Sequence, residues 1–282
     1  MIGESKKIKT KDELELNLTV LENGSPVWII VTHGLGEHSG RHEYFDKIFS
    51  QYFNICRWDL RGHGKSGGKK SYVENFSKYV EDLDSVIAFL KDNYKMNRHM
   101  LFAHSMGSLV TASYLQKKVS DKNYPEKVFL SGPPVAGPGV LGKMFEIAPL
   151  GFSSALGNLN QSIALGGMLD IKKLSHDTRV YDNYIKDPLN SLKIHSRLFF
   201  NILAEARDVF SKPLRVSCPL FVALAGEDKL INPNSALEYF SKIEKNAKVV
   251  TIENGYHELH NEIEKFRSPY FKFLKESLLE TN

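Results

Sequence analysis

The sequence predicts an α/β fold: a mostly parallel central sheet with helices on both faces and an inserted helical cap. Short apolar runs alternate along the chain with longer segments of helical period, and several of these runs are apolar on both faces. Such runs suit strands that are buried between two layers of helices. One long segment, residues 133–213, interrupts the alternation. With 282 residues, the chain has room for a sizeable core and for such an insertion.

The strand candidates are short apolar runs, and the helix candidates lie between them. The strand candidates are residues 14–21, 26–33, 53–59, 99–104, 127–132, 219–226 and 248–253. The helix candidates are residues 75–95, 106–118, 234–245 and 261–279. Because parallel strands need a long crossover connection, this alternation favours a parallel sheet with helices on both faces.

The interrupting segment is predicted to be a separate cap. Prolines bound it at both ends, and it is far longer than a normal crossover. The core should therefore comprise residues 1–132 and 214–282, and the cap residues 133–213. Within the cap, residues 147–169 carry no charge and contain four glycines. One interpretation is a helical cap buried on the core. The other is that part of it lines an apolar ligand tunnel or touches a lipid surface.

Composition and charge exclude several classes of protein. Apolar residues make up 42% and charged residues 25%, as in an ordinary globular chain. The net charge is +4, and residues 1–11, with four lysines and one glutamate, account for +3 of it. We expect this segment to be a solvated tail and the folded domain to lack the basic face of a nucleic-acid binder. No apolar run is long enough to span a bilayer.

The cysteines and the N-terminal residues indicate where in the cell the protein is expected. Cys56 and Cys218 border apolar runs and are expected to be buried free thiols rather than a disulfide framework. The N-terminus has basic residues but no apolar stretch of the signal-peptide kind. A cytoplasmic location is therefore expected, with peripheral membrane contact through the cap as the alternative. The oligomeric state is not predicted.

The strongest chemical signal is the segment Ala103-His104-Ser105-Met106-Gly107. It follows a strand candidate and opens a helix candidate, which is the context of a nucleophile elbow. The turn of such an elbow is tight, so the residues two before and two after the serine must be small. Ala103 and Gly107 meet this need, although glycine is commoner at the first position. The elbow would raise the Ser105 hydroxyl above the sheet and direct the first helical amides at the substrate.

A serine hydroxyl needs a base, and the base needs an orienting acid. In a fold with such an elbow, the acid and then the histidine follow the serine along the chain, on loops after later strands. His257 follows the last strand candidate and is the predicted base. Asp228, after the preceding strand candidate, is the predicted acid, and the adjacent Glu227 is the alternative.

The oxyanion that forms during acyl transfer needs two hydrogen-bond donors. One should be the backbone N–H of Met106, directly after the nucleophile. The other should be the N–H of Leu35 in the segment His33-Gly34-Leu35-Gly36, which ends an early strand candidate. The glycines would let the backbone approach the substrate. His33 is expected to be a structural hydrogen-bonding residue rather than a catalytic one.

At this point four motifs resemble a known family. HGLGEHSGR (33–41), DLRGHGKSGG (59–68), AHSMGS (103–108) and GYHELHNE (255–262) are similar to motifs of the α/β-hydrolases of the monoglyceride lipase and lysophospholipase group, which includes serine aminopeptidase-like sequences. The resemblance runs from about residue 12 to 279 and is weakest in the insertion. The first and last motifs are the most specific.

The resemblance implies a substrate-binding polar pocket. In monoglyceride lipases the first motif supplies an oxyanion amide, here that of Leu35, and a glutamate and an arginine that hold the glycerol end, here Glu37 and Arg41. By the same resemblance His260 and the cap residue Tyr184, in YIKDP, belong to this pocket. The alternative for Glu37 and Arg41 is a structural ion pair that braces the oxyanion loop.

The sequence departs from the family pattern in two places. Ile231 stands where the family often carries a cysteine, and the cap outside residues 181–189 does not align, so no acyl-length preference carries over. Two histidine pairs, His38 with His42 and His257 with His260, have tolerable spacing for a metal, but no carboxylate–histidine cluster accompanies them. No metal and no cofactor is predicted, and no phosphate-binding glycine loop is present.

The predicted function is hydrolysis of single-chain lipid esters, foremost monoacylglycerols, through a Ser-His-Asp triad and an acyl-enzyme. A lysophospholipase, in which Arg41 would face a phosphate, and a general carboxylesterase are the enzymatic alternatives. An aminopeptidase is disfavoured because no acidic cluster for a free amine is evident. The non-enzymatic alternative is a hydrolase-fold protein that only binds a ligand.

Overall fold

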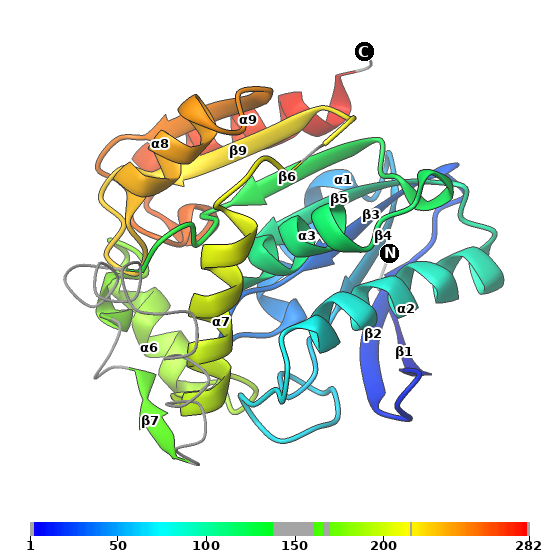
Figure 1. Ribbon diagram of the computed structural model, residues 1–282. Helices are drawn as coiled ribbons and strands as arrows, with labels where there is room; N and C mark the ends of the chain where they lie inside the picture. The colour runs from blue at the N-terminus through cyan, green and yellow to red at the C-terminus, as the bar shows by residue number, and fades with distance from the viewer. Residues whose placement is uncertain (1–2, 138–160, 166–169, 215, 281–282) are drawn as a thin grey trace.

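The computed structural model describes residues 3–137, 161–165, 170–214 and 216–280 of the chain. An eight-stranded sheet forms its centre, in the strand order β1-β2-β4-β3-β5-β6-β9-β10 (Figure 1). These strands are β1 Glu4–Lys9, β2 Glu15–Leu21, β3 Val27–Thr32, β4 Asn54–Trp58, β5 Arg98–His104, β6 Lys127–Ser131, β9 Leu220–Ala225 and β10 Ala247–Ile252. The pairs β1–β2 and β2–β4 are antiparallel, and every other pair is parallel. The predicted mostly parallel sheet is therefore confirmed.

Helices cover both faces of the sheet, as predicted (Figure 1). The helices of the core are α1 Tyr44–Phe49, α2 Ser77–Tyr94, α3 Met106–Lys117, α8 Pro233–Lys242 and α9 Glu264–Leu279. Apolar residues of α2, α3 and α8 belong to one buried cluster, and those of α1 and α9 belong to a second. The α1 helix was not predicted, because six residues are too few to show a helical period.

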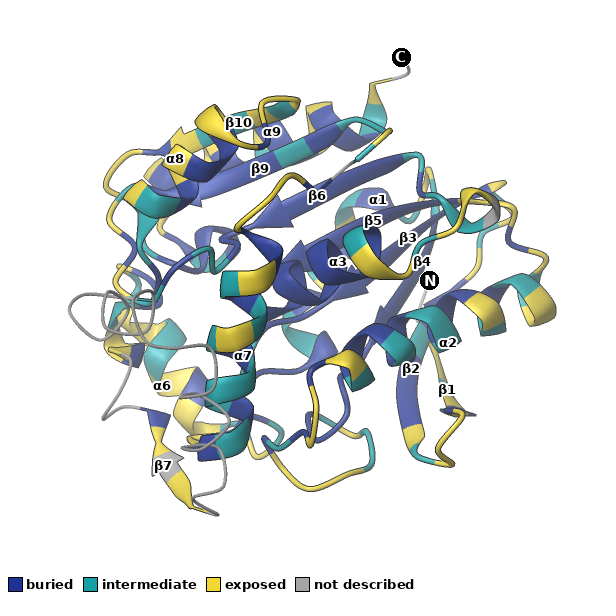
Figure 2. Cartoon of the chain, viewed as in Figure 1, coloured by how far each residue is buried: buried dark blue, intermediate teal, exposed yellow. Residues whose placement is uncertain are grey.

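Strand β3 shows why the parallel strands are apolar on both faces. Ile30 packs in the cluster that includes α2 and α3, whereas Ile29 and Val31 pack in the cluster that includes α1 and α9. Successive side chains of a strand point to opposite faces, so a strand between two helical layers needs apolar residues at every position. Figure 2 accordingly shows the central strands as buried between the helices.

The N-terminal segment is not the solvated tail that was predicted. Residues Glu4–Lys9 form β1, an edge strand that pairs with β2. Ile8 lies opposite Leu16 and is buried, whereas the lysines of the strand point outward and pair with glutamates at the surface. Charged side chains are common on edge strands because they discourage pairing with other chains. Because charged residues are so frequent in this segment, the sequence did not indicate a strand here.

The described part of residues 133–213 lies beside the carboxyl ends of the parallel strands (Figure 1). It contains helices α6 Thr178–Lys186 and α7 Ser196–Val209, and the short strands β7 Ser162–Ala164 and β8 Lys193–His195, which pair with each other. Helix α7 packs on α3, where Glu205 accepts a hydrogen bond from Ser113 (2.5 Å). The β7–β8 pair was not expected in a helical cap.

Further predictions concern the uncharged stretch of the insertion, the two cysteines and the length of the helices. Of the uncharged stretch 147–169, only residues 161–165 fall within the described ranges. Cys56 is a buried free thiol as predicted, whereas Cys218 is also free but only half-buried, because it lies in the loop before β9. Within the described ranges, every helix is too short or too polar to cross a bilayer.

Candidate active site

The nucleophile elbow lies between β5 and α3. Ser105 adopts φ 51° and ψ −122°, a conformation that side chains rarely occupy outside tight turns. Its backbone N–H donates to the carbonyl of Ser131 on the neighbouring strand (2.8 Å), which fixes the turn. A Cβ added to Gly107 would lie 2.5 Å from the carbonyl oxygen of His33. The predicted need for a small residue at this position therefore has a specific steric cause.

Ser105, His257 and Asp228 come together at the carboxyl ends of β5, β10 and β9. His257 Nε2 lies 2.9 Å from Ser105 Oγ, and His257 Nδ1 lies 2.6 Å from Asp228 Oδ2. The second carboxylate oxygen of Asp228 accepts the backbone N–H groups of Leu230 (2.8 Å) and Ile231 (3.1 Å). Because an ionised carboxylate only accepts, Nδ1 of His257 carries the proton, and Nε2 is free to accept the serine hydroxyl.

The electrostatics of His257 follow from this arrangement. Burial acts to lower the pKa of His257, but the charge of Asp228 and its hydrogen bond outweigh burial, and the pKa is raised above its ordinary value. The alternative acid, Glu227, does not reach the histidine. Its side chain is 49% exposed and pairs with Lys229 at the surface.

The loop after β3 carries Leu35, whose amide is the predicted partner of the Met106 amide. Glu37 Oε1 accepts the Gly34 N–H at 2.5 Å, which braces this loop. Leu35 and Met106 both line the same cavity as Ser105, and among the described residues neither backbone N–H has a hydrogen-bond acceptor. His33 accepts the Leu60 N–H at Nε2 (2.9 Å) and donates from Nδ1 to the Gly34 carbonyl (2.8 Å). Its contacts are those of a structural residue.

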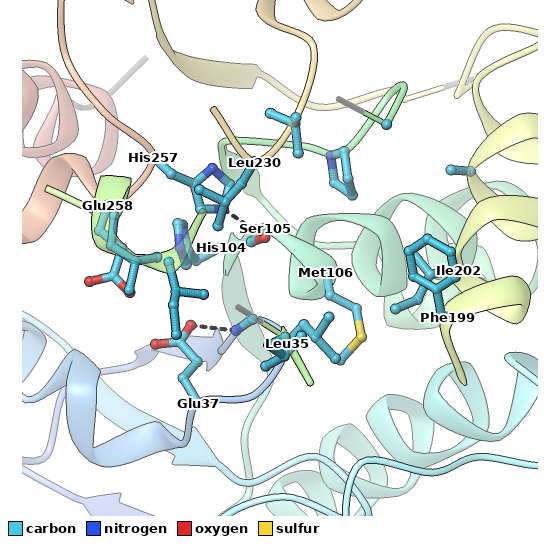
Figure 3. Close-up of a pocket in the computed structure, with 18 of the residues that line it drawn as sticks. Leu35, Glu37, His104, Ser105, Met106, Phe199, Ile202, Leu230, His257 and Glu258 are labelled. Carbon is cyan, nitrogen blue, oxygen red and sulfur yellow. Dashed lines mark hydrogen bonds between the residues drawn. The ribbon is translucent and has the colours of Figure 1, made fainter. Parts of the chain in front are cut away.

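A cavity opens directly above Ser105 and has an apolar and a polar side (Figure 3). Apolar side chains from the core and the insertion line most of it: Leu35, Met106, Leu165, Ile171, Leu174, Phe199, Ile202, Leu203, Ala206, Leu230 and Ile231. The polar lining side chains are Glu37, His104, Ser105, Tyr184, His257 and Glu258. Figure 3 shows Glu37 and Glu258 on one side of Ser105 and Phe199 and Ile202 on the other. The cavity is thus amphiphilic.

Of the four residues assigned to a polar pocket, Glu37 and Tyr184 line the cavity. The Tyr184 hydroxyl donates to the Gly36 carbonyl (2.8 Å), which ties the insertion to the loop that carries Leu35. Arg41 does not line the cavity. Its guanidinium lies over the ring of Tyr184, 4.9 Å from the ring centroid, and pairs with Glu37 (3.2 Å) and with Glu258. These contacts match the alternative interpretation, in which Arg41 braces the loop.

His260 also lies away from the cavity. Its ring is buried against those of His42, Tyr44 and His104, at centroid distances of 4.9, 5.3 and 5.0 Å. Burial lowers the pKa of His260 well below its ordinary value, so the ring is neutral. Motif resemblance placed this residue in the pocket, but His260 is not among the residues that line the cavity, and of its three aromatic neighbours only His104 is.

No site role was predicted for two polar residues of the cavity, His104 in the elbow and the glutamate Glu258. Glu258 follows His257 directly, and its side chain is 3% exposed. Besides Arg41, its carboxylate accepts the side-chain amide of Asn261 (2.8 Å). A carboxylate next to the predicted base was a visible signal, but sequence adjacency does not tell on which side of a loop a side chain points.

The histidines considered as metal ligands are engaged in other contacts of the protein. His38 pairs with Asp187 (2.9 Å), and His42 lies 3.2 Å from Glu37. Among the described residues, no group of three or more histidine, cysteine or acidic side chains is arranged to hold a metal ion. The geometry described above can perform acyl transfer with protein groups alone: a nucleophile, a base with its acid, and two free amides.

Three comparisons with known proteins bear on this site. Residues 26–264 match the family model Hydrolase_4, described as serine aminopeptidase, S33. The chain is similar to a monoacylglycerol lipase of Mycolicibacterium smegmatis, with 26% identity over 243 residues that cover 84% of this chain and 82% of that protein. It is 26% identical over 255 residues to an uncharacterized abhydrolase domain-containing protein of Dictyostelium discoideum, covering 89% of this chain but 26% of that protein's length.

Solved structures give a fold comparison. The crystal structure of Paleococcus ferrophilus monoacylglycerol lipase aligns with a TM-score of 0.77 and 24% identity, covering 93% of this chain and 99% of that chain. At this level of identity the likeness shows a shared α/β-hydrolase fold.

Proposed function

The chain belongs to the Hydrolase_4 family (serine aminopeptidase, S33), and on this premise we propose that it cleaves monoacylglycerols or closely similar single-chain lipid esters. It is a carboxylic ester hydrolase. The single observation that carries the proposal is the hydrogen-bonded series Ser105–His257–Asp228 at the floor of an amphiphilic cavity. The relatives named as monoacylglycerol lipases support the choice of substrate.

The proposed reaction proceeds through an acyl-enzyme. His257 Nε2 takes the proton of the Ser105 hydroxyl as Oγ attacks the ester carbonyl carbon. The amides of Leu35 and Met106 hold the oxyanion of the tetrahedral intermediate. As this intermediate collapses, the ester C–O bond breaks, and His257 returns the proton to the leaving alcohol. A water molecule, activated by the same histidine, then releases the fatty acid and restores Ser105. Asp228 holds the imidazole in the required tautomer throughout.

The substrate class follows from the two sides of the cavity. The apolar side, to which Phe199 and Ile202 contribute, suits one acyl chain. The opposite side presents Glu37, a buried carboxylate that can accept hydrogen bonds from hydroxyl groups of a glycerol. We keep residues 133–213 as the proposed cap, because their described part supplies much of the apolar side. Transient contact of this cap with a membrane or micelle, where such a substrate resides, belongs to the same proposal.

The test is turnover of a series of esters by the purified full chain. We expect hydrolysis of p-nitrophenyl esters and of monoacylglycerol, and a loss of at least about 10³-fold in the variant Ser105→Ala. A fluorophosphonate probe should label Ser105 and leave Ser108, the buried serine of the same helix, unlabelled. The proposal fails if no ester is cleaved, or if Ser105→Ala cleaves esters at the rate of the unaltered chain.

A further inference from the structure

We propose that Glu258 makes the polar side of the cavity anionic and thereby selects esters with a neutral head group against esters with an anionic one. This inference rests on the proposed function, because it concerns the substrate of the same site. It adds a specificity-determining residue that lies outside the reacting triad.

The proposal starts from the surroundings of Arg41. This guanidinium is shared by two carboxylates: Nε lies 3.2 Å from Glu37 Oε2, and Nη2 contacts Glu258 Oε2. The side chains of Glu37, Glu258 and Arg41 are 2%, 3% and 11% exposed, so water screens them little. Both carboxylates line the cavity, whereas Arg41 is not among its lining residues and has its guanidinium against the ring of Tyr184, 4.9 Å from the ring centroid. A head group entering the cavity therefore meets the negative groups first.

The described lining of the cavity offers no other cation to an anionic head group. Among the described residues that line the cavity there is no lysine or arginine. His104 is neutral, because burial lowers its pKa well below the ordinary value. His42 lies behind Glu37, at 3.2 Å from its Oε1, and His257 is held by the carboxylate of Asp228. Of the described residues, Arg41, His42 and His257 thus each already face a carboxylate.

The consequence for substrates is a difference in affinity that arises mainly from repulsion. A phosphate brought beside Glu37 and Glu258 would add negative charge in a site of low effective dielectric and would find no free cation. A neutral glycerol hydroxyl can instead donate a hydrogen bond to either carboxylate. Rejecting a competitor by unfavourable charge is a common route to specificity. The two carboxylates at the cavity therefore disfavour the lysophospholipase alternative, in which Arg41 would face a phosphate.

The test compares two substrates with the same acyl chain, 1-monoacylglycerol and 1-acylglycerol-3-phosphate, presented in neutral detergent micelles. For the unaltered chain we expect kcat/KM to favour the neutral ester by about tenfold or more. The variant Glu258→Gln keeps the size and one acceptor oxygen but removes the charge. It should lower this preference at least about fivefold, by raising kcat/KM for the phosphate ester. Glu227→Gln, which removes a charge from an exposed side chain, is the matched control and should leave the preference unchanged.

A second measurement does not depend on the variant. Non-hydrolysable 1-O-alkylglycerol and its 3-phosphate should inhibit the unaltered chain competitively, with the phosphate about tenfold or more weaker. Equal or tighter inhibition by the phosphate overturns the inference, and so does a preference that Glu258→Gln leaves intact. In either case hydrolysis of monoacylglycerol continues. A failure of the proposed function is distinguishable, because then neither ester is cleaved.

Discussion

The carboxylate of Glu37 accepts the backbone N–H of Gly34 at 2.5 Å, so a residue of the cavity's polar side also holds the loop that positions the Leu35 amide. This one contact would connect the proposed recognition of the head group with the proposed stabilisation of the oxyanion. The two roles can be separated by comparing substrates, because only a lipid ester presents glycerol hydroxyls, whereas every ester develops an oxyanion.

Glu37→Ala should lower kcat/KM for a simple p-nitrophenyl ester as well as for monoacylglycerol. The Gly34 amide loses its acceptor, and the Leu35 amide is no longer held in place, so we expect a loss of about ten- to a hundredfold for both substrates. Glu37→Gln, which retains an acceptor oxygen, should recover most of the activity toward the simple ester. If Glu37→Ala lowers kcat/KM for monoacylglycerol alone, then Glu37 does not brace the loop.

The activity should depend on pH through His257. The neutral imidazole is the active base, and the charge of Asp228 raises the pKa of His257 although burial opposes it. The rate should therefore fall as pH decreases through a value above the ordinary histidine pKa of about 6.5. Asp228→Asn removes the cause of the upward shift, so the midpoint should move to lower pH and the plateau rate should drop by roughly 10³- to 10⁴-fold. A kcat/KM–pH profile whose midpoint does not move in Asp228→Asn would contradict this account.

Gly107→Ala should damage the elbow through a steric clash with the backbone of β3. Its Cβ would lie 2.5 Å from the His33 carbonyl oxygen and 2.6 Å from that of Thr32. We expect the free energy of unfolding to fall by about 2 kcal/mol or more, and kcat to drop because the helix that carries Met106 shifts. Gly24→Ala is a useful control, since its added Cβ meets nothing within 4 Å and only the strain of φ +83° remains. Denaturant unfolding and nitrophenyl ester turnover check both variants.

Tyr184→Phe should weaken the connection between the insertion and the oxyanion loop. The lost hydrogen bond to the Gly36 carbonyl is 2.8 Å long and buried. The same carbonyl also accepts the Ser191 N–H (2.8 Å), so it keeps one partner and the cost in unfolding free energy should be only about 1 kcal/mol. We expect a several-fold fall in kcat/KM for monoacylglycerol. A variant whose stability and activity both equal those of the unaltered chain would show that this contact has no role.

Much of the fold could be predicted because parallel strands leave a clear pattern. Runs such as that of β3 are apolar at every position from Val27 to Val31, and the helices between such runs have a regular period. The pattern failed at β1, where the lysines of an edge strand resemble a solvated tail, and at α1, which is too short to show a period. Both elements depend on contacts with other segments: β1 pairs with β2, and α1 packs in the second apolar cluster.

The sequence by itself determined the order of the chemical groups along the chain: an elbow with small residues around Ser105, an acid and a histidine on later loops, and a glycine on each side of Leu35. These motifs are local, because each turn imposes its own steric demands. Only the tertiary structure decided how side chains from distant segments share space. It paired Arg41 with both Glu37 and Glu258, enclosed His260 among aromatic rings, and brought Glu258 to the cavity. Which way a side chain points, and which charges it faces, depends on packing between segments that the sequence keeps far apart.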